Sequence, residues 1–112
     1  MALPHATSGT VLDLRPLGGK CTTFSSIALI KTPQLEVVRL TMPRGKAMPA
    51  HQVPGEITVQ CLEGSIAFSI GGQVKTLRAG DMIFVAGNAM HALEALENAS
   101  ALITILLGKS AG

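Results

Sequence analysis

Large and small side chains alternate most regularly over residues 65–70, and this pattern predicts a half-buried β-strand. Its large apolar residues are separated by Ala and Ser, and a two-residue period places them on one face of a strand. Gly71 and Gly72 follow at once, and glycine adopts the positive φ angles that tight hairpin turns need. We therefore expect residues 73–77 to return antiparallel to the first strand.

Further apolar segments have the length of strands and are separated by Gly, Pro, Asn and Ser, which favour turns. They cover residues 35–42, 57–63, 82–85, 91–96 and 101–107. Seven or so strands with Gly-rich turns, and no convincing amphipathic helix, predict an all-β sandwich or barrel. Such an architecture follows because each half-buried sheet must bury its apolar face against another.

Residues 101–107 are apolar on both faces, so this strand needs cover on both sides. A partner subunit can supply the second cover in a chain this short, and we expect a homodimer. Residues 1–24 show little periodicity and are expected to form an arm. The arm would include a strand near residues 11–14 and pair with a sheet edge of its own or a neighbouring subunit. Residues 25–110 would form the barrel.

Composition narrows the class of protein. The 112 residues are 47% hydrophobic and 14% charged, which fits one folded domain. The longest apolar stretch is far shorter than the roughly 18 to 20 residues of a spanning helix, and the N-terminus lacks the pattern of a signal peptide. We therefore expect a soluble, cytoplasmic protein with no membrane partner.

Charge and aromatic content argue against a nucleic-acid partner. Nine basic and seven acidic residues are scattered along the chain, and Trp and Tyr are absent. Cys21 and Cys61 lie far apart with no CxxC pattern, so they are expected to be reduced thiols.

His51 and His91 occupy comparable places, at or just before the start of predicted strands. In a small barrel the interior ends of adjacent strands line one mouth, so imidazoles from two strands can converge on a ligand or a metal ion. The alternative is that each is an ordinary strand-end histidine bonded to the backbone or to solvent.

Two segments resemble the paired motifs of the cupin family. The first has glycine, five residues, histidine and a later glycine, and the second has glycine, five residues, then Asn and His. The matching positions are Gly45, His51, Val53 and Gly64, and then Gly80, Ala86, Asn88 and His91. The resemblance implies a double-stranded β-helix, or jelly-roll, barrel.

The resemblance also implies a metal site, and the sequence departs from it. The family uses two histidines and a glutamate of the first motif and the histidine of the second. Val53 stands at the position of the second histidine, and Ile57 at that of the glutamate. The nearest carboxylate, Glu56, would face inward only if Pro54 and Gly55 formed a bulge. His51, His91 and Glu56 would then suit iron, manganese, nickel or zinc.

Three functions are compatible with these residues. The first is a metal-free binding module for a small, mainly apolar or weakly acidic molecule. Its pocket would comprise His51, Val53, Ile57, Val59, Gln60, Cys61, Phe68, Phe84 and His91. The second is a metal-dependent dioxygenase or isomerase that uses His51, His91 and Glu56. The third is a structural protein whose barrel mouth is filled by Met48, Val53 and Met90.

Overall fold

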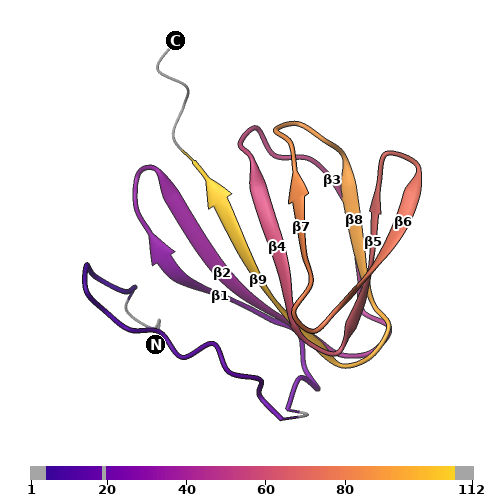
Figure 1. Ribbon diagram of the computed structural model, residues 1–112, viewed down its shortest axis with the longest axis horizontal. Coiled ribbons are helices and arrows are strands. Elements are labelled where there is room, and N and C mark those ends of the chain that lie inside the picture. Colours follow the sequence, from indigo (N-terminus) through magenta and orange to yellow (C-terminus); the bar gives the residue numbers. More distant parts are fainter. Residues whose placement is uncertain (1–4, 19, 108–112) are drawn as a thin grey trace.

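The computed structural model describes residues 5–18 and 20–107 of the chain, and in this part it contains strands and no helix (Figure 1). One sheet has the order β1-β2-β9-β4-β7. Its strands are β1 (Ser25–Lys31), β2 (Leu35–Met42), β9 (Ala99–Leu106), β4 (Ile57–Glu63) and β7 (Met82–Val85). The other sheet has the order β3-β8-β5-β6. Its strands are β3 (Ala47–His51), β8 (His91–Ala95), β5 (Ser65–Ile70) and β6 (Gln73–Arg78).

The two antiparallel sheets face each other as the layers of a double-stranded β-helix barrel, so the predicted fold class is confirmed. They lie closest at the bottom of Figure 1 and diverge toward the top, where the chain passes from β3 to β4 and from β7 to β8. The space between the layers is filled by apolar side chains from both inner faces. The most deeply buried of these are Leu40, Met42, Val59, Cys61, Ile66, Phe68 and Val85. In residues 5–18 and 20–107 no helix could span a membrane.

The predicted hairpin is present as β5 and β6. Ile70 is the Cα partner of Gln73, and the two residues between them, Gly71 and Gly72, have φ angles of 59° and 77°. Both values lie in the left-handed region that glycine adopts without steric cost. The alternation along the sequence therefore identified both the strand and its turn.

Two strands were not predicted. β1 carries a short apolar run without alternation, and its register against β2 shifts between Ala28 and Ile30. β3 contains a proline and leaves most of its residues exposed, so no hydrophobic period marks it. The strand expected near residues 11–14 is wrong, because this segment forms no strand in the structure.

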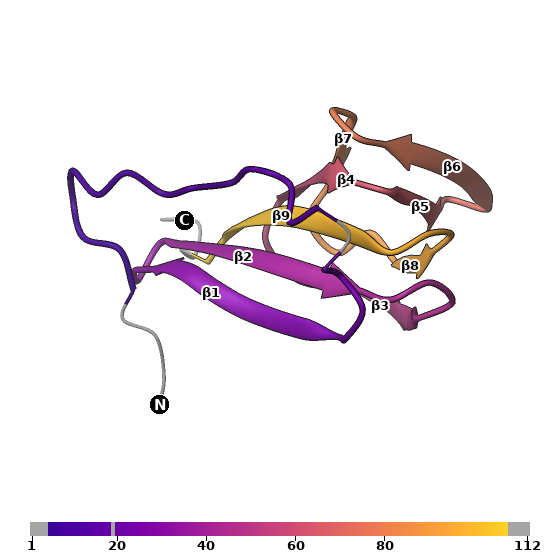
Figure 2. The ribbon, with the colours of Figure 1, turned by 90° about the horizontal axis from the view of Figure 1, so that it is seen from below.

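The arm is instead held by its backbone against the outer face of the five-stranded sheet (Figure 2). The Leu17 N–H donates to both carboxylate oxygens of Glu63, at 3.0 and 2.8 Å. Arg39 Nη2 donates to the Arg15 carbonyl at 2.8 Å and lies 3.5 Å from Glu63 Oε2. Because these contacts use arm backbone atoms, side chains of β2 and β4 fix the path of the arm. The predicted boundary at residue 110 lies outside the described residues.

Glu63 is the centre of this attachment. Burial opposes its ionisation, but hydrogen bonds from the Leu17 N–H, the Ser100 hydroxyl and Cys21 outweigh burial and hold the Glu63 pKa below its ordinary value. Burial, together with the neighbouring Glu63, raises the pKa of the Cys21 thiol. The cluster is therefore an ionised carboxylate surrounded by donors, and Cys21 is a buried free thiol, as is Cys61.

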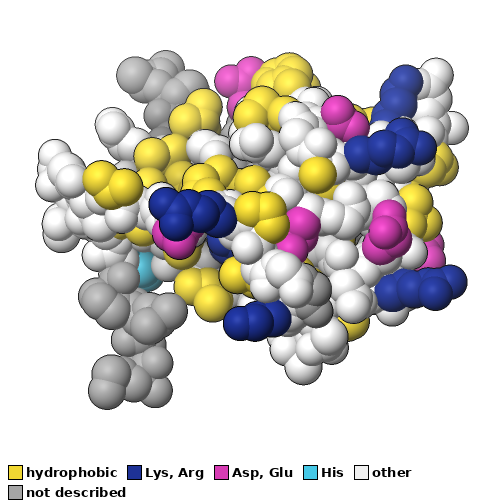
Figure 3. All heavy atoms as spheres, turned by 60° about the horizontal axis from the view of Figure 1, so that its bottom comes forward, with side chains coloured by type: hydrophobic (Ala, Val, Ile, Leu, Met, Phe, Trp, Pro, Cys, Tyr) yellow, Lys and Arg dark blue, Asp and Glu magenta, His cyan; other side chains and the backbone are white. Residues whose placement is uncertain are grey.

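Apolar residues remain on the outer face of the same sheet. Met82 and Phe84 on β7 are 58% and 59% exposed, and Leu106 at the end of β9 is also exposed. Figure 3 shows apolar side chains gathered over the left and centre of the molecule, with Lys and Arg both among them and at the right edge. The arm is bonded to Arg39 of β2 and Glu63 of β4, the strands on either side of β9. The homodimer stays a prediction.

Candidate functional site

A small cavity lies between the sheets at the end of the barrel that carries His51 and His91. It encloses about 90 Å³. Its walls come from four strands, β3, β4, β8 and β9, and from the segment that joins β3 to β4. They are formed by Met48, His51, Val53, Ile57, Val59, His91, Leu93, Ile103 and Ile105. Among these lining residues the two imidazoles are the only polar side chains.

A bulge in β3 places His51 in this cavity. Met48 pairs with Leu93 of β8, but the next pair in the ladder joins His51 to His91. Three steps along β3 therefore correspond to two along β8, so β3 contains one extra residue. Regular alternation would send Met48 and His51 to opposite faces, and the extra residue brings both to the cavity. Pro49 lies within the bulge, where its missing N–H interrupts no ladder bond.

The two histidines face each other as the sequence analysis expected. Their ring centroids are 4.4 Å apart with an interplanar angle of 57°. His91 is only 3% exposed, whereas His51 is exposed. His51 therefore stands at the solvent side of the pair and His91 at its inner side.

Each ring is oriented by the same backbone interaction. His51 Nδ1 lies 3.1 Å from the Pro49 carbonyl oxygen, and His91 Nδ1 lies 2.9 Å from that of Ala89. A carbonyl oxygen only accepts, so both interactions place the proton of a neutral imidazole on Nδ1. The Nε2 atom of each ring is left as the nitrogen that can accept a hydrogen bond or bind a metal.

Of the nine residues predicted to form the pocket, five line it. These are His51, Val53, Ile57, Val59 and His91. Phe68 lies behind the site, with its ring stacked on His91 at a centroid distance of 5.6 Å. Cys61 is buried elsewhere in the core, where its thiol donates to the Glu63 carbonyl at 3.4 Å and burial raises its pKa.

Gln60 and Phe84 are corrections to the predicted pocket. Ile57, Val59 and Cys61 of β4 face inward, so Gln60 between them faces outward. Phe84 is the Cα partner of Thr58, the other outward residue of this segment, and is itself 59% exposed. Both side chains therefore lie on the outer face of the barrel and not in its mouth.

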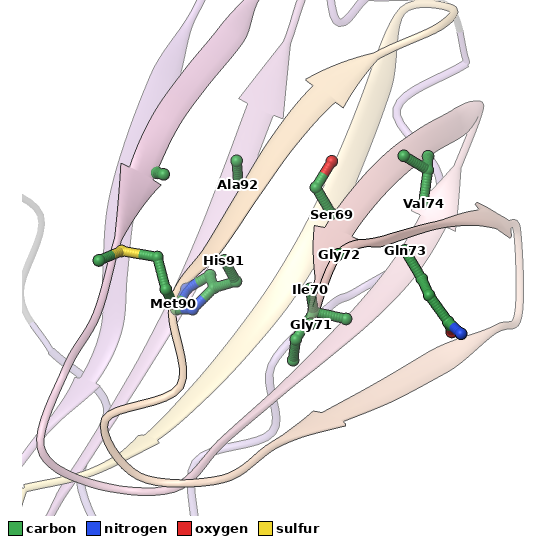
Figure 4. A pocket seen from close by; sticks show the side chains of 10 residues that line it. Ser69, Ile70, Gly71, Gly72, Gln73, Val74, Met90, His91 and Ala92 are labelled. Carbon is green, nitrogen blue, oxygen red and sulfur yellow. The ribbon is translucent and has the colours of Figure 1, made fainter.

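The lining also includes residues that the sequence analysis did not assign to the pocket, namely Leu93, Ile103 and Ile105. The last two alternate on the inner face of β9, and this period was their available signal. Met48 and Val53 line the cavity without closing it. Met90 is 54% exposed and lies at a second, open hollow of about 490 Å³ between the β5–β6 turn and the start of β8 (Figure 4).

The predicted third metal ligand is a further correction. Glu56 is exposed and immediately precedes β4, while Ile57 faces the cavity. The bulge lies in β3 and not at Pro54 and Gly55. A Cβ on Gly55 would lie 1.9 Å from the Leu106 carbonyl oxygen, so close approach to the end of β9 requires this glycine.

The donor set does not fit a resident metal of the type the family motifs imply. In residues 5–18 and 20–107 there is no group of three or more His, Cys, Asp or Glu side chains placed to hold an ion. Catalytic sites for zinc and related ions use three protein ligands and an open position. The cavity instead combines two imidazoles with aliphatic walls.

A barrel of two facing antiparallel sheets, with paired histidines at its open end, defines the class of this protein. The family model described as a cupin domain matches residues 38–107, which is more than half of the chain, and the chain belongs to the cupin family. No curated protein matches the sequence.

Solved structures agree on the fold. A conserved protein of unknown function from Streptococcus pyogenes, SPY1581, is 20% identical with a TM-score of 0.78, over 98% of this chain and 97% of that one. An RmlC-like cupin from Methanocaldococcus jannaschii, described as a double-stranded β-helix, is 15% identical with a TM-score of 0.72, over 88% and 93%. KdgF from Halomonas is 20% identical with a TM-score of 0.72, over 77% and 82%.

Proposed function

We propose that this cupin binds a small, mainly apolar or weakly acidic molecule in the mouth of its barrel, oriented by His51 and His91 and without a resident metal. The observation that carries the proposal is the pair of imidazoles, 4.4 Å apart, over an otherwise apolar cavity. Binding pockets characteristically combine apolar walls with a few polar groups that fix the ligand's orientation.

The orientation of the rings supports the proposal. Both Nδ1 atoms are engaged by backbone carbonyls, so each ring has one nitrogen left for a ligand. A mainly apolar molecule with one polar end can bury carbon against the aliphatic walls and satisfy these nitrogens at the same time. An unpaired polar group in such a cavity would cost roughly 1 to 3 kcal/mol.

The alternative, a metal-dependent dioxygenase or isomerase, would need a further ligand from the protein. Val53 and Ile57 line the cavity with aliphatic side chains where the family motif has histidine and glutamate, and Glu56 is exposed. The binding module is therefore favoured over the metalloenzyme.

Elemental analysis of protein purified without chelators separates these two functions. Wild type, His51→Ala and His5→Ala are compared, with His5 as an exposed histidine outside the site. We expect iron, manganese, nickel and zinc to be far below one equivalent in all three. Near-stoichiometric metal in wild type and His5→Ala, but not in His51→Ala, would overturn the metal-free proposal.

Ligand binding is tested by thermal shift against a panel of small acids, alcohols and apolar metabolites, followed by native mass spectrometry. At least one compound should raise the melting temperature of wild type and His5→Ala and leave His51→Ala unchanged. No shift with any compound, and no bound mass, would contradict the binding function.

The assembly is also a proposal. Exposed Met82, Phe84 and Leu106 on the outer face are the apolar side chains that a second copy would cover. Sedimentation velocity across a tenfold concentration range tests this expectation, because a homodimer should give twice the monomer mass of 11.6 kDa.

A further inference from the structure

We infer that the molecule taken by this site is a short-chain aliphatic monocarboxylic acid, with its carboxyl group at the Nε2 atoms of His51 and His91 and its alkyl chain directed toward Val59, Leu93 and Ile103. This inference rests on the proposed binding function and specifies its ligand. Three properties of the cavity lead to it: its volume, the chemistry of its walls and the number of polar atoms at its mouth.

The volume of the cavity limits the length of the ligand's alkyl chain. The cavity encloses about 90 Å³. An apolar cavity of about 150 Å³ is the size that takes the six carbons of benzene, so a cavity of about 90 Å³ has room for about four carbons and a six-membered ring is too large for it. The acid should therefore have about four carbons, with the carboxyl carbon at the mouth.

The walls select an aliphatic chain. Seven of the nine lining residues are aliphatic or methionine, and none carries a formal charge when the imidazoles are neutral. A hydroxyl or amine on the inner part of the ligand would lose its hydrogen bonds to water and find no partner. Each buried methylene group, by contrast, contributes about 0.8 kcal/mol.

The two imidazoles at the mouth of the cavity determine which polar head group the ligand carries. Two imidazoles, each with its Nδ1 occupied, present one free nitrogen each. A carboxylic acid has two oxygens and one proton. The acid's proton moves to one Nε2 and a proton from solvent adds to the other, so that each resulting N–H donates to one carboxylate oxygen and no other bond is made or broken. Charge-assisted hydrogen bonds of this kind are about twice as strong as neutral ones, so an acid should bind better than an alcohol of equal length.

The inner position of His91 and the outer position of His51 give the ligand a direction. His91 is buried against Phe68, so its ring cannot turn away without disturbing the core. His51 is exposed and stands where the head group would meet solvent. The carboxyl group is therefore expected at the solvent side and the chain at the inner side.

The inference is tested by calorimetry with linear acids of two to eight carbons and with the alcohols and amides of the same lengths. Affinity should peak near about four carbons, fall at least tenfold by six, and be at least tenfold lower for the alcohols and amides. Equal affinity for acids and alcohols would overturn the assignment of a carboxyl head group. A steady rise in affinity to eight carbons would overturn the length limit.

The position of the ligand's alkyl chain is tested with Ile103→Ala. This substitution enlarges the inner end of the cavity, so the acid that binds most tightly should be longer by one or two carbons. Thr104→Ala is the matched control, because Thr104 is the next residue of β9 and faces the other side. If Ile103→Ala does not fold, Ile103→Val should give a smaller shift in the same direction. An unchanged preference in folded Ile103 variants would place the chain elsewhere and overturn the inference.

The two proposals fail in different ways. If other panel compounds bind in a His51-dependent manner but no acid of the series does, the ligand class is wrong and the binding function stands. If no compound of any class binds, the binding function fails with it.

Discussion

Phe68 of β5 stacks on His91 of β8 with their ring planes only 5° apart and their centroids 5.6 Å apart. Both residues are inner-face residues of neighbouring strands, since Ile70 pairs with His91 and Phe68 with Leu93. The stack, together with the bond from Nδ1 to the Ala89 carbonyl, holds the His91 imidazole in one orientation. A core aromatic residue therefore positions a residue of the candidate site.

The first prediction concerns this stack. Phe68→Leu keeps an apolar side chain but removes the aromatic face, and we expect the free energy of unfolding to fall by about 1 to 3 kcal/mol. Chemical denaturation measures the loss, and the NMR shifts of the His91 ring protons should move as the ring current disappears. Phe84→Leu is the control, because Phe84 is exposed and should change stability by less than about 0.5 kcal/mol. Unchanged His91 shifts in Phe68→Leu would contradict the stack.

The second prediction is that the two histidines contribute unequally to stability. His91→Ala removes a buried ring packed on Phe68 and should lower the free energy of unfolding by about 2 kcal/mol. His51→Ala removes an exposed ring and should cost less than about 1 kcal/mol. Both variants should nevertheless lose ligand binding. Equal destabilisation in urea titrations would show that the two rings are packed alike, contrary to the structure.

The alternation of apolar and polar residues along the sequence predicted most of the strands. Where the prediction failed, the reason lies in the residues of the individual strand. β5 and β6 were recognisable because large residues recur every second position and two glycines follow. β7 is apolar at all four positions, so its sequence has no period that says which face is inward. Pairing with β4 decides this and turns Phe84 outward.

The candidate site was predictable only in part for a similar reason. The two histidines could be placed at strand ends, but their meeting depends on an extra residue in β3 between Met48 and His51. From the sequence, a bulge was considered only at Pro54 and Gly55, whereas the structure has its bulge around Pro49. Without a bulge after residue 53, Ile57 and not Glu56 faces the cavity, and the predicted metal ligand is lost.

The third prediction concerns the attachment of the arm. Because the Glu63 pKa is lowered in the folded protein, its ionised form contributes stability above the ordinary carboxyl pKa of about 4.3, and the contribution is lost as pH falls through the lower folded value. Glu63→Gln should therefore be about 1 to 2 kcal/mol less stable than wild type at pH 7, and the difference should shrink steadily below about pH 5.

Urea denaturation from pH 7 to pH 3 measures this difference, and hydrogen exchange reports on the arm directly. The Leu17 amide donates to Glu63, so it should exchange faster in Glu63→Gln at pH 7. Glu94→Gln, at an exposed carboxylate of β8, is the control and should leave both measurements unchanged. A difference between wild type and Glu63→Gln that is constant with pH would show that ionisation of Glu63 does not hold the arm.

The last prediction compares Gly64 and Gly80, which stand at glycine positions of the two cupin motifs. Gly64 and Gly80 have φ angles of 75° and 95°, so an alanine at either position adopts a left-handed conformation at a cost of about 1 to 2 kcal/mol. Only Gly64 is also crowded. A Cβ there would lie 2.2 Å from the Asn98 carbonyl oxygen, whereas at Gly80 it would meet nothing within 4 Å.

Gly64→Ala should therefore lose about 3 kcal/mol or more, because the turn between β4 and β5 must separate from the turn before β9. Gly80→Ala should lose only the cost of its backbone conformation and keep the native near-ultraviolet spectrum. Thermal and urea unfolding of the two variants measure the difference. Equal losses would mean that the backbone conformation, and not the close approach of the two turns, is what requires glycine at residue 64.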